Sequence, residues 1–191
     1  MYRHFLKRLI DIVLSFIAII LLAIPMLIIS LLILITDPGP VFFRQKRFGK
    51  DKTFFKILKF RTMKVSTPDV PTDKLKNPEQ YVTGIGKVLR KTSLAELPQL
   101  FNILVGHMSF IGPRPALWNQ EKLIELRDKV HANDVRPGLS GWAQINGRDG
   151  ISEKKKAKLD SEYVENISFV FDCKCFFSTF AQVFKSEGIK A

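Results

Sequence analysis

The chain has 191 residues, 46% of them hydrophobic and 25% charged, a composition that excludes a disordered or collagen-like chain. Lysine and arginine number 30 against 18 acidic residues, so the net charge is +12. This charge favours an anionic partner: nucleic acid, an anionic membrane surface or a phosphorylated substrate. The two cysteines, Cys173 and Cys175, cannot form a disulfide framework or complete a zinc site, which indicates a reducing compartment.

A long apolar segment follows the N-terminal residues. Residues 12–36 are 25 consecutive uncharged residues, flanked by Asp11 and Asp37. As a straight helix they would be about 37 Å long, against a hydrocarbon core of roughly 30 Å. The segment is too long for the apolar part of a signal peptide and no cleavage pattern follows it. It is therefore predicted to lie in a membrane.

The topology of this segment has two interpretations. Basic residues lie on both sides of it, which draws both flanks to the cytoplasm. Pro25 lies near its middle, where it removes a helix hydrogen bond and favours a kink. A re-entrant helix that bends near residues 23–25 and leaves on the entry side satisfies both facts. A membrane-spanning anchor with a proline kink is the alternative.

The rest of the chain, residues 37–191, is polar enough to form a cytoplasmic domain at the membrane surface. Residues 41–62 are predicted to form a β-hairpin that turns at residues 49–51. Helices are predicted over residues 84–105, 116–132, 152–166 and 168–187, with loops over 64–80, 106–116 and 133–150. The last helix is heavily aromatic, which fits a core helix or one in the membrane interface equally well. The prediction is an α+β fold, mostly helical, with residues 1–36 as the membrane part.

A short segment within the predicted helix 84–105 contains a candidate site. Ser93 and Glu96 have the spacing of a capping box at a helix start, and Leu97, Leu100, Phe101 and Leu104 continue as an apolar stripe. Pro98 fits that helix poorly and predicts a bend. Glu96 either only caps the helix or, beside arginines, holds a divalent metal that carries phosphates.

Three arginines lie beside glycine and proline, in residues 112–115, 135–138 and 146–148. Their guanidinium groups match phosphate oxygens, and rigid loops would hold them in place for a diphosphate. For each one alone a solvated surface arginine is the favoured interpretation, and three in such loops weaken it without deciding the matter. No helix-turn-helix, RNA-binding or phosphate-loop signature is present, so nucleic acid is not expected as a partner.

The chain resembles the monotopic phosphoglycosyl transferases, the bacterial sugar transferase family, in its minimal form. The resemblance extends over nearly the whole chain. The matching residues are Lys7-Arg8 with Asp11, the proline-broken apolar helix, Phe43 with Gln45, Lys59-Phe60-Arg61-Thr62-Met63, Leu97-Pro98-Gln99-Leu100, Asn102, Met108 to Pro115, Val135-Arg136-Pro137-Gly138, Gly141, Gln144, Asn146-Gly147-Arg148 and Tyr163 to Asp172.

The resemblance implies an activity at the cytoplasmic face of the bacterial inner membrane. Such an enzyme moves a sugar-1-phosphate from a UDP-sugar to undecaprenyl phosphate and releases UMP, with Mg2+ as cofactor and anionic membrane lipids as neighbours. An Asp-Glu pair does the chemistry: the Asp forms a covalent phosphosugar intermediate and the Glu binds the metal. Here Glu96 would bind Mg2+, and the expected phosphate or substrate contacts are Lys59, Arg90, Arg114, Arg136 and Arg148.

The chain departs from the family pattern at the nucleophile. The family motif reads Ser-Leu-Asp-Glu-Leu-Pro, whereas this chain has Ala95 before Glu96. A methyl group cannot attack phosphorus, so the chain as it stands is expected to be inactive. Because the surrounding motifs are intact, an introduced Asp→Ala change is favoured over a naturally inactive sugar-nucleotide-binding scaffold. The sequence does not identify the sugar or the oligomeric state.

Overall fold

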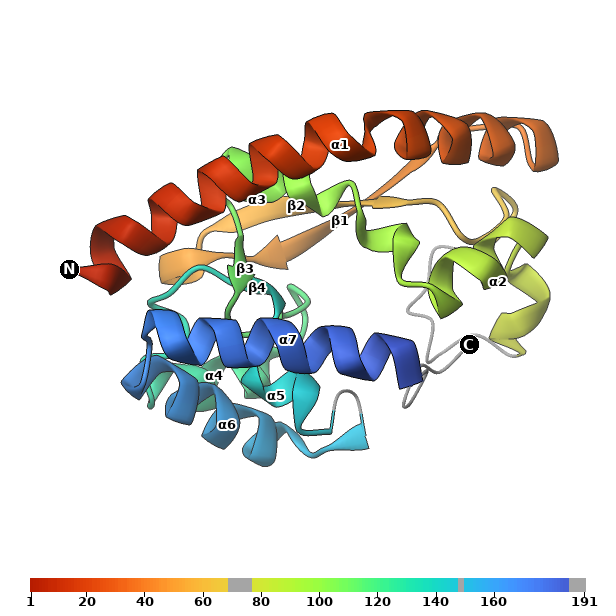
Figure 1. Cartoon of the computed structure of the whole chain (residues 1–191). Helices are drawn as coiled ribbons and strands as arrows, with labels where there is room; N and C mark the ends of the chain where they lie inside the picture. Colours follow the sequence, from red (N-terminus) through yellow and green to blue (C-terminus); the bar gives the residue numbers. More distant parts are fainter. Residues whose placement is uncertain (69–76, 148–149, 186–191) are drawn as a thin grey trace.

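The computed structural model describes residues 1–68, 77–147 and 150–185 and has the predicted α+β class. Helix α1 (Lys7–Thr36) runs along one side of the molecule, and α6 (Glu153–Glu165) and α7 (Phe169–Lys185) lie on the opposite side (Figure 1). The other elements are β1 (Phe42–Phe48), β2 (Phe54–Phe60), α2 (Gly84–Lys91), α3 (Gln99–Leu104), β3 (Ser109–Ile111), α4 (Glu121–Asp128), β4 (Gly138–Ser140) and α5 (Trp142–Ile145).

The predicted apolar segment lies within one continuous helix, α1, with Pro25 inside it. One face of the helix is buried, through Asp11, Ser15, Met26, Ile29 and Ile33. Most other side chains are open: Leu21 and Ile35, for example, are 72% and 75% exposed. In the described part of the chain, α1 is the one helix long and apolar enough to cross a membrane. So large an uncovered apolar surface indicates association with a membrane.

The N-terminal end of α1 is tied to the folded domain by charged side chains. Lys7 Nζ lies 2.5 Å from a carboxylate oxygen of Asp172 on α7. Arg8 donates to the carbonyl oxygens of Ile103 and Leu104 at 2.6 and 2.8 Å, at the C-terminal end of α3. Buried Asp11 accepts hydrogen bonds from the Ser109 hydroxyl and the Phe110 amide, both at 3.1 Å.

The other end of α1 is tied to the same domain. Asp37, the residue after the helix, forms an ion pair with Arg61 at 2.9 Å, and Arg61 also donates to the Asp37 carbonyl oxygen. Between the two ends, Met26, Ile29 and Ile33 share an apolar cluster with Phe60 and with Leu89 of α2. Helix α1 is therefore fastened to one domain at both ends and along one face.

The predicted hairpin is confirmed. Strands β1 and β2 pair antiparallel, from Phe42 opposite Phe60 to Phe48 opposite Phe54. The turn closes with a hydrogen bond from the Gly49 amide to the Thr53 carbonyl, and a short 3-10 segment covers Lys50–Lys52.

The predicted helix over residues 84–105 is broken at its centre, and the capping box is wrong. Ser93 has a left-handed backbone (φ 60°) and caps nothing with its side chain, and Leu94–Glu96 is a single 3-10 turn. Helix α3 begins only after Pro98, where the missing proline N–H needs no partner. The predicted apolar stripe is wrong at Phe101, which is 41% exposed.

The segments predicted as loops around residues 106–116 and 133–150 contain a small parallel sheet. Strand β3 pairs with β4, Ser109 opposite Gly138 and Ile111 opposite Ser140. The sheet depends on close backbone contact, because a Cβ on Gly138 would lie only 2.1 Å from the Gly112 amide nitrogen. This contact joins two of the arginine-bearing loops.

Helix α7 is confirmed and buries one face. Cys175 is fully buried and packs with Tyr163 and Ile111, whereas Phe169 and Phe177 are 56% and 68% exposed. The helix therefore combines a core face with an exposed aromatic face. The side chains of Phe180 and Phe184, which the sequence placed in the same aromatic segment, lie outside those the structure describes.

We expect Gly138→Ala to lower the free energy of unfolding by about 1–3 kcal/mol, because its Cβ would overlap backbone atoms that cannot move aside cheaply. Gly84→Ala is the matched control: it opens α2, no atom lies within 4 Å of the added Cβ, and alanine favours the helix. Denaturation of both variants in detergent measures the difference. Equal stability would contradict the sheet contact.

Candidate functional site

Two segments far apart in sequence meet at the candidate site. Along β2, Phe55, Ile57 and Lys59 point to one face because strand side chains alternate, and Phe55 and Ile57 pack against α3. Lys59 extends this face toward the 3-10 turn Leu94–Glu96. There its Nζ donates to Glu96 Oε1 at 2.8 Å. The sequence prediction that Lys59 and Glu96 share a pocket is consistent with this contact.

Asn102 on α3 sets the register between the two segments. Its Nδ2 donates to the Lys56 carbonyl at 3.0 Å and its Oδ1 accepts from the Leu58 amide at 2.9 Å. The amide thus pairs with the backbone of β2 as a further strand would. Since Lys59 follows Leu58 directly, Asn102 fixes Lys59 opposite Glu96.

The charges around Glu96 keep it ionised. Burial alone raises the pKa of the Glu96 carboxyl, but Lys59 and Arg114 more than offset this and hold the pKa below its usual value. Lys59 is affected in the opposite sense: burial lowers its pKa, Glu96 partly offsets this, and Arg114 and Arg47 repel the ammonium. One carboxylate thus faces more positive charge than it neutralises, an arrangement that would attract a further anion.

Arg114 is held next to this pair by a rigid loop. The Gly112 amide donates to the Ser140 carbonyl at 2.8 Å and the Gly138 amide to the Pro113 carbonyl at 2.9 Å. Arg127, itself paired with buried Asp160 at 2.7 Å, donates to the Arg114 carbonyl at 2.9 Å. These bonds are consistent with the predicted rigid presentation of this arginine.

The other predicted arginines are placed differently. Arg90 lies at the end of α2, and its Nε donates to Thr62 Oγ1 at 3.1 Å. Thr62 follows Lys59 closely in the chain. Arg136 belongs to a second group: its Nε donates to the Gly106 carbonyl at 2.9 Å, and its charge lies near that of Arg8. Arg148 lies outside the described residues.

Ala95 lies behind Glu96, against the membrane helix. It is 8% exposed and belongs to the apolar cluster with Met26, Ile29 and Ile33 of α1. The methyl group fits this cluster. An aspartate there would place its carboxyl group at the edge of this apolar cluster, one residue before Glu96.

Gln99 was not among the predicted site residues. It is the first residue of α3, 2% exposed, and its side chain helps to lower the pKa of Glu96. Its Nε2 nevertheless has no hydrogen-bond partner of normal geometry. Within the sequence its place in the resembled Leu97-Pro98-Gln99-Leu100 motif was the one available signal.

A magnesium ion fits the donor set only with help from a substrate. The described residues contain no cluster of three or more His, Cys, Asp or Glu side chains. Mg2+ commonly takes one or two carboxylates, several waters and substrate phosphates. The ionised Glu96 can supply one such carboxylate, and a diphosphate held by the nearby cations can supply further oxygens.

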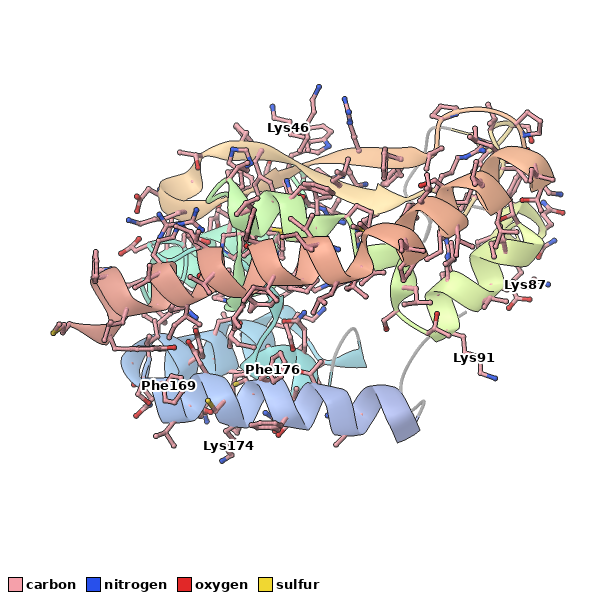
Figure 2. All side chains as sticks on the ribbon, turned by 45° about the horizontal axis from the view of Figure 1, so that its top comes forward. Lys46, Lys87, Lys91, Phe169, Lys174 and Phe176 are labelled. Atoms are coloured by element: carbon pink, nitrogen blue, oxygen red, sulfur yellow. The ribbon has the colours of Figure 1, made fainter. Side chains whose placement is uncertain are left out.

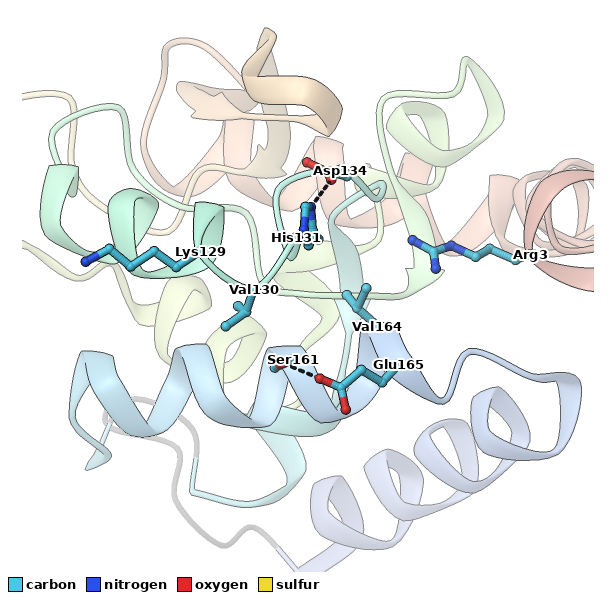
Figure 3. Close-up of a pocket in the computed structure, with 8 residues that line it drawn as sticks. All are labelled: Arg3, Lys129, Val130, His131, Asp134, Ser161, Val164 and Glu165. Atoms are coloured by element: carbon cyan, nitrogen blue, oxygen red, sulfur yellow. Dashed lines mark hydrogen bonds and ion pairs between the residues drawn. The ribbon is translucent and has the colours of Figure 1, made fainter.

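Two cavities lined by described residues lie apart from this pair. One, of about 520 Å³, contains the pairs His131–Asp134 and Ser161–Glu165 and is approached by Arg3 (Figure 3). The other, of about 240 Å³, lies beside the N-terminal half of α1 and includes Arg8, Asp11 and Arg136. Neither includes Lys59, Ala95 or Glu96.

We expect Glu96→Gln to lower the free energy of unfolding at neutral pH by about 1–3 kcal/mol, because Lys59 loses its counter-ion. The folded pKa of Glu96 is depressed, so its stabilisation is complete above the usual glutamate pKa and is lost as the pH falls through the folded value. Denaturation at a series of pH values should show the difference from the unchanged chain shrinking in acid.

The exposed Glu125 on α4 provides the control variant, Glu125→Gln. It should alter the unfolding free energy little at any pH. A Glu96→Gln effect that is constant from neutral to acidic pH would show that the Lys59–Glu96 charge interaction does not stabilise the fold.

Comparison with known proteins gives one family. The model of the bacterial sugar transferase family matches residues 2–186. The chain is 41% identical over 196 residues to the UDP-glucose:undecaprenyl-phosphate glucose-1-phosphate transferase of Escherichia coli, covering 99% of this chain and 42% of that protein. It is 39% identical to the exopolysaccharide production protein PSS of Rhizobium leguminosarum, and the match covers 91% of this chain and 92% of that protein.

A third relative carries a different sugar in its name. The UDP-N-acetylgalactosamine-undecaprenyl-phosphate N-acetylgalactosaminephosphotransferase of Aeromonas hydrophila is 37% identical, over 97% of this chain and 45% of that protein. The chain thus spans less than half the length of two of these relatives and nearly all of the third.

Proposed function

We propose that this chain, which belongs to the bacterial sugar transferase family, is built to transfer a sugar-1-phosphate from a UDP-sugar to undecaprenyl phosphate with release of UMP. This would be the first membrane step in the synthesis of a glycoconjugate. The observation that carries the proposal is an ionised carboxylate, Glu96, among Lys59 and Arg114 and directly beside an apolar membrane helix. The names of two relatives specify the same reaction class with different sugars.

The proposed reaction has two displacements at one phosphorus atom. An aspartate oxygen at position 95 would attack the sugar-bearing phosphorus, and the bond to the UMP oxygen would break. An oxygen of the lipid phosphate would then attack the same phosphorus and free the carboxylate. Ala95 supplies no oxygen, so we propose that this chain is an inactivated Asp→Ala form. A naturally inactive membrane-bound sugar-nucleotide scaffold is the alternative.

The cations of the site have a role in this reaction. Arg114 and Lys59 would bind the diphosphate and offset the charge that develops on UMP, and Arg90 lies close enough in the chain to extend this surface. Glu96 would bind Mg2+, which neutralises phosphate charge when present. Arg136, held near Arg8, is better placed to act at the membrane surface than at the diphosphate.

The tethering of α1 supports the re-entrant topology. Asp11 near one end and Asp37 at the other are bonded to the same domain, through Ser109 and Arg61. A helix that crossed the whole bilayer would place these two ends on opposite sides, where one domain cannot reach both. We therefore propose that α1 enters and leaves the membrane on the cytoplasmic side.

The smaller cavity supports a contact with anionic lipids at that face. Five of its lining residues are cations, and its two carboxylates are both already hydrogen-bonded, Asp11 to Ser109 and Asp134 to His131. Exposed apolar side chains, such as Phe5 just before α1 and Leu9 within it, come from the same end of the helix. Phosphate headgroups suit such a position. Nucleic acid is not part of the proposal.

We expect Ala95→Asp to release UMP from a UDP-sugar, with undecaprenyl phosphate and Mg2+, on the order of 10³-fold faster than the unchanged chain or more. The same change should lower the unfolding free energy by about 1–3 kcal/mol, because it buries a carboxyl group among apolar side chains. The assay uses a panel of UDP-sugars, and the active sugar identifies the donor.

Glu96→Gln in the Ala95→Asp background is the companion variant. It should reduce the rate and the dependence on Mg2+, and an unchanged rate would contradict the metal role. If Ala95→Asp stays inactive with every sugar while the chain binds UDP-sugars, the scaffold is the correct interpretation.

The topology prediction uses single cysteines at Arg3 and Pro40, on either side of α1, in a Cys173→Ser background where Cys175 is buried. A membrane-impermeant thiol reagent should label both positions from the cytoplasmic side of sealed vesicles. Labelling of the two positions from opposite sides would show that α1 spans the membrane.

A further inference from the structure

Gln99 combines two properties that rarely occur together. Its side chain is 2% exposed, at the start of α3, and its Nε2 has no hydrogen-bond partner of normal geometry. An amide donor that leaves water without gaining a bond lowers the stability of the fold, and an apolar side chain of similar shape removes that cost. Packing alone therefore gives no reason for a glutamine at this position.

The neighbour of this amide is the carboxylate of Glu96, with which the Gln99 side chain interacts. In the described part of the chain, the one hydrogen bond of normal geometry to Glu96 comes from Lys59, to Oε1 at 2.8 Å. Glu96 thus has accepting capacity left on the side of a buried donor that lacks a partner.

The backbone around Gln99 is held firmly. Pro98 restricts the entry to α3, and Asn102, three residues after Gln99, is bonded to β2 at both amide atoms. The amide of Gln99 therefore has a fixed origin, while Glu96 lies on a single 3-10 turn with fewer constraints. The Glu96 carboxylate is bonded to Lys59 through Oε1.

We propose that Gln99 is a positioning residue for Glu96: its Nε2 donates to the Glu96 carboxylate when that group turns from Lys59 toward a divalent cation and its bound phosphates. This rests on the metal role in the proposed function. Carboxylates that bind metals are generally fixed by a second hydrogen bond, and loss of that partner commonly weakens metal binding or activity by about 10–100-fold.

The test separates this role from a structural one by comparing stability with metal binding. Gln99→Met removes the donor and keeps the volume. We expect it to change the thermal midpoint of the metal-free chain little, because the cost of the buried donor and its favourable effect on ionised Glu96 oppose each other. It should weaken Mn2+ binding in the presence of UDP by about tenfold or more, measured by electron paramagnetic resonance. In the Ala95→Asp background it should lower kcat by a similar factor and change KM for the UDP-sugar little.

Gln144 provides a matched control, because its Oε1 is also buried without a partner while its Nε2 is bonded to the Leu139 carbonyl, away from Glu96. Gln144→Met should leave Mn2+ binding unchanged. Gln99→Leu serves as a second substitution if methionine disturbs the packing. Its thermal midpoint identifies a folding defect before binding is compared.

Two results would overturn the proposal: folded Gln99→Met with unchanged Mn2+ binding, or absence of Mn2+ binding by the unchanged chain with UDP. Both are independent of turnover. If Mn2+ binding falls as expected but Ala95→Asp releases no UMP, the positioning role stands and the transferase proposal fails.

Discussion

The apolar face of α1 must be covered by something other than this chain, and yet both ends of the helix are tied to the same domain. Lys7 binds Asp172 at one end and Asp37 binds Arg61 at the other. These two conditions support the proposal that the domain lies against one surface of the membrane. The exposed aromatic face of α7 is consistent with that position. Basic side chains such as Lys46, Lys87 and Lys91 are distributed over the hairpin and α2 (Figure 2).

The electrostatics of the candidate site follow from an imbalance. Glu96 faces two cations, so it remains ionised although it is largely buried, whereas Lys59 has one carboxylate and two arginines for neighbours. The surplus positive charge suits a diphosphate. Two sets of hydrogen bonds hold the backbone of the site. Asn102 joins α3 to β2, and the loops at Gly112 and Gly138 are bonded to each other's neighbours around Arg114.

Local patterns predicted much of the fold. The apolar helix, the hairpin and helices α6 and α7 each follow from a continuous run or a repeated spacing, and the resemblance placed Lys59 with Glu96. The capping box failed because Ser93 has a left-handed backbone, and Glu96 bonds instead to a strand 37 residues earlier. The β3–β4 pair was missed because three-residue strands show no alternation and depend on contact between distant glycines. Gln99 was missed because the lack of a partner is a property of the folded chain alone.

The apolar cluster around Ala95 gives α1 a second role besides attachment to the membrane. Met26, Ile29 and Ile33 of α1 make the wall against which position 95 packs. In the proposed reaction the segment would therefore line the nucleophile position as well as tether the domain. A version that lacks residues 1–36 would expose Phe60 and Leu89, and it would lose the side chains that pack against position 95. Replacing residues 1–36 with an unrelated apolar helix would restore attachment to the bilayer, but it would not restore the packing of Met26, Ile29 and Ile33 against position 95.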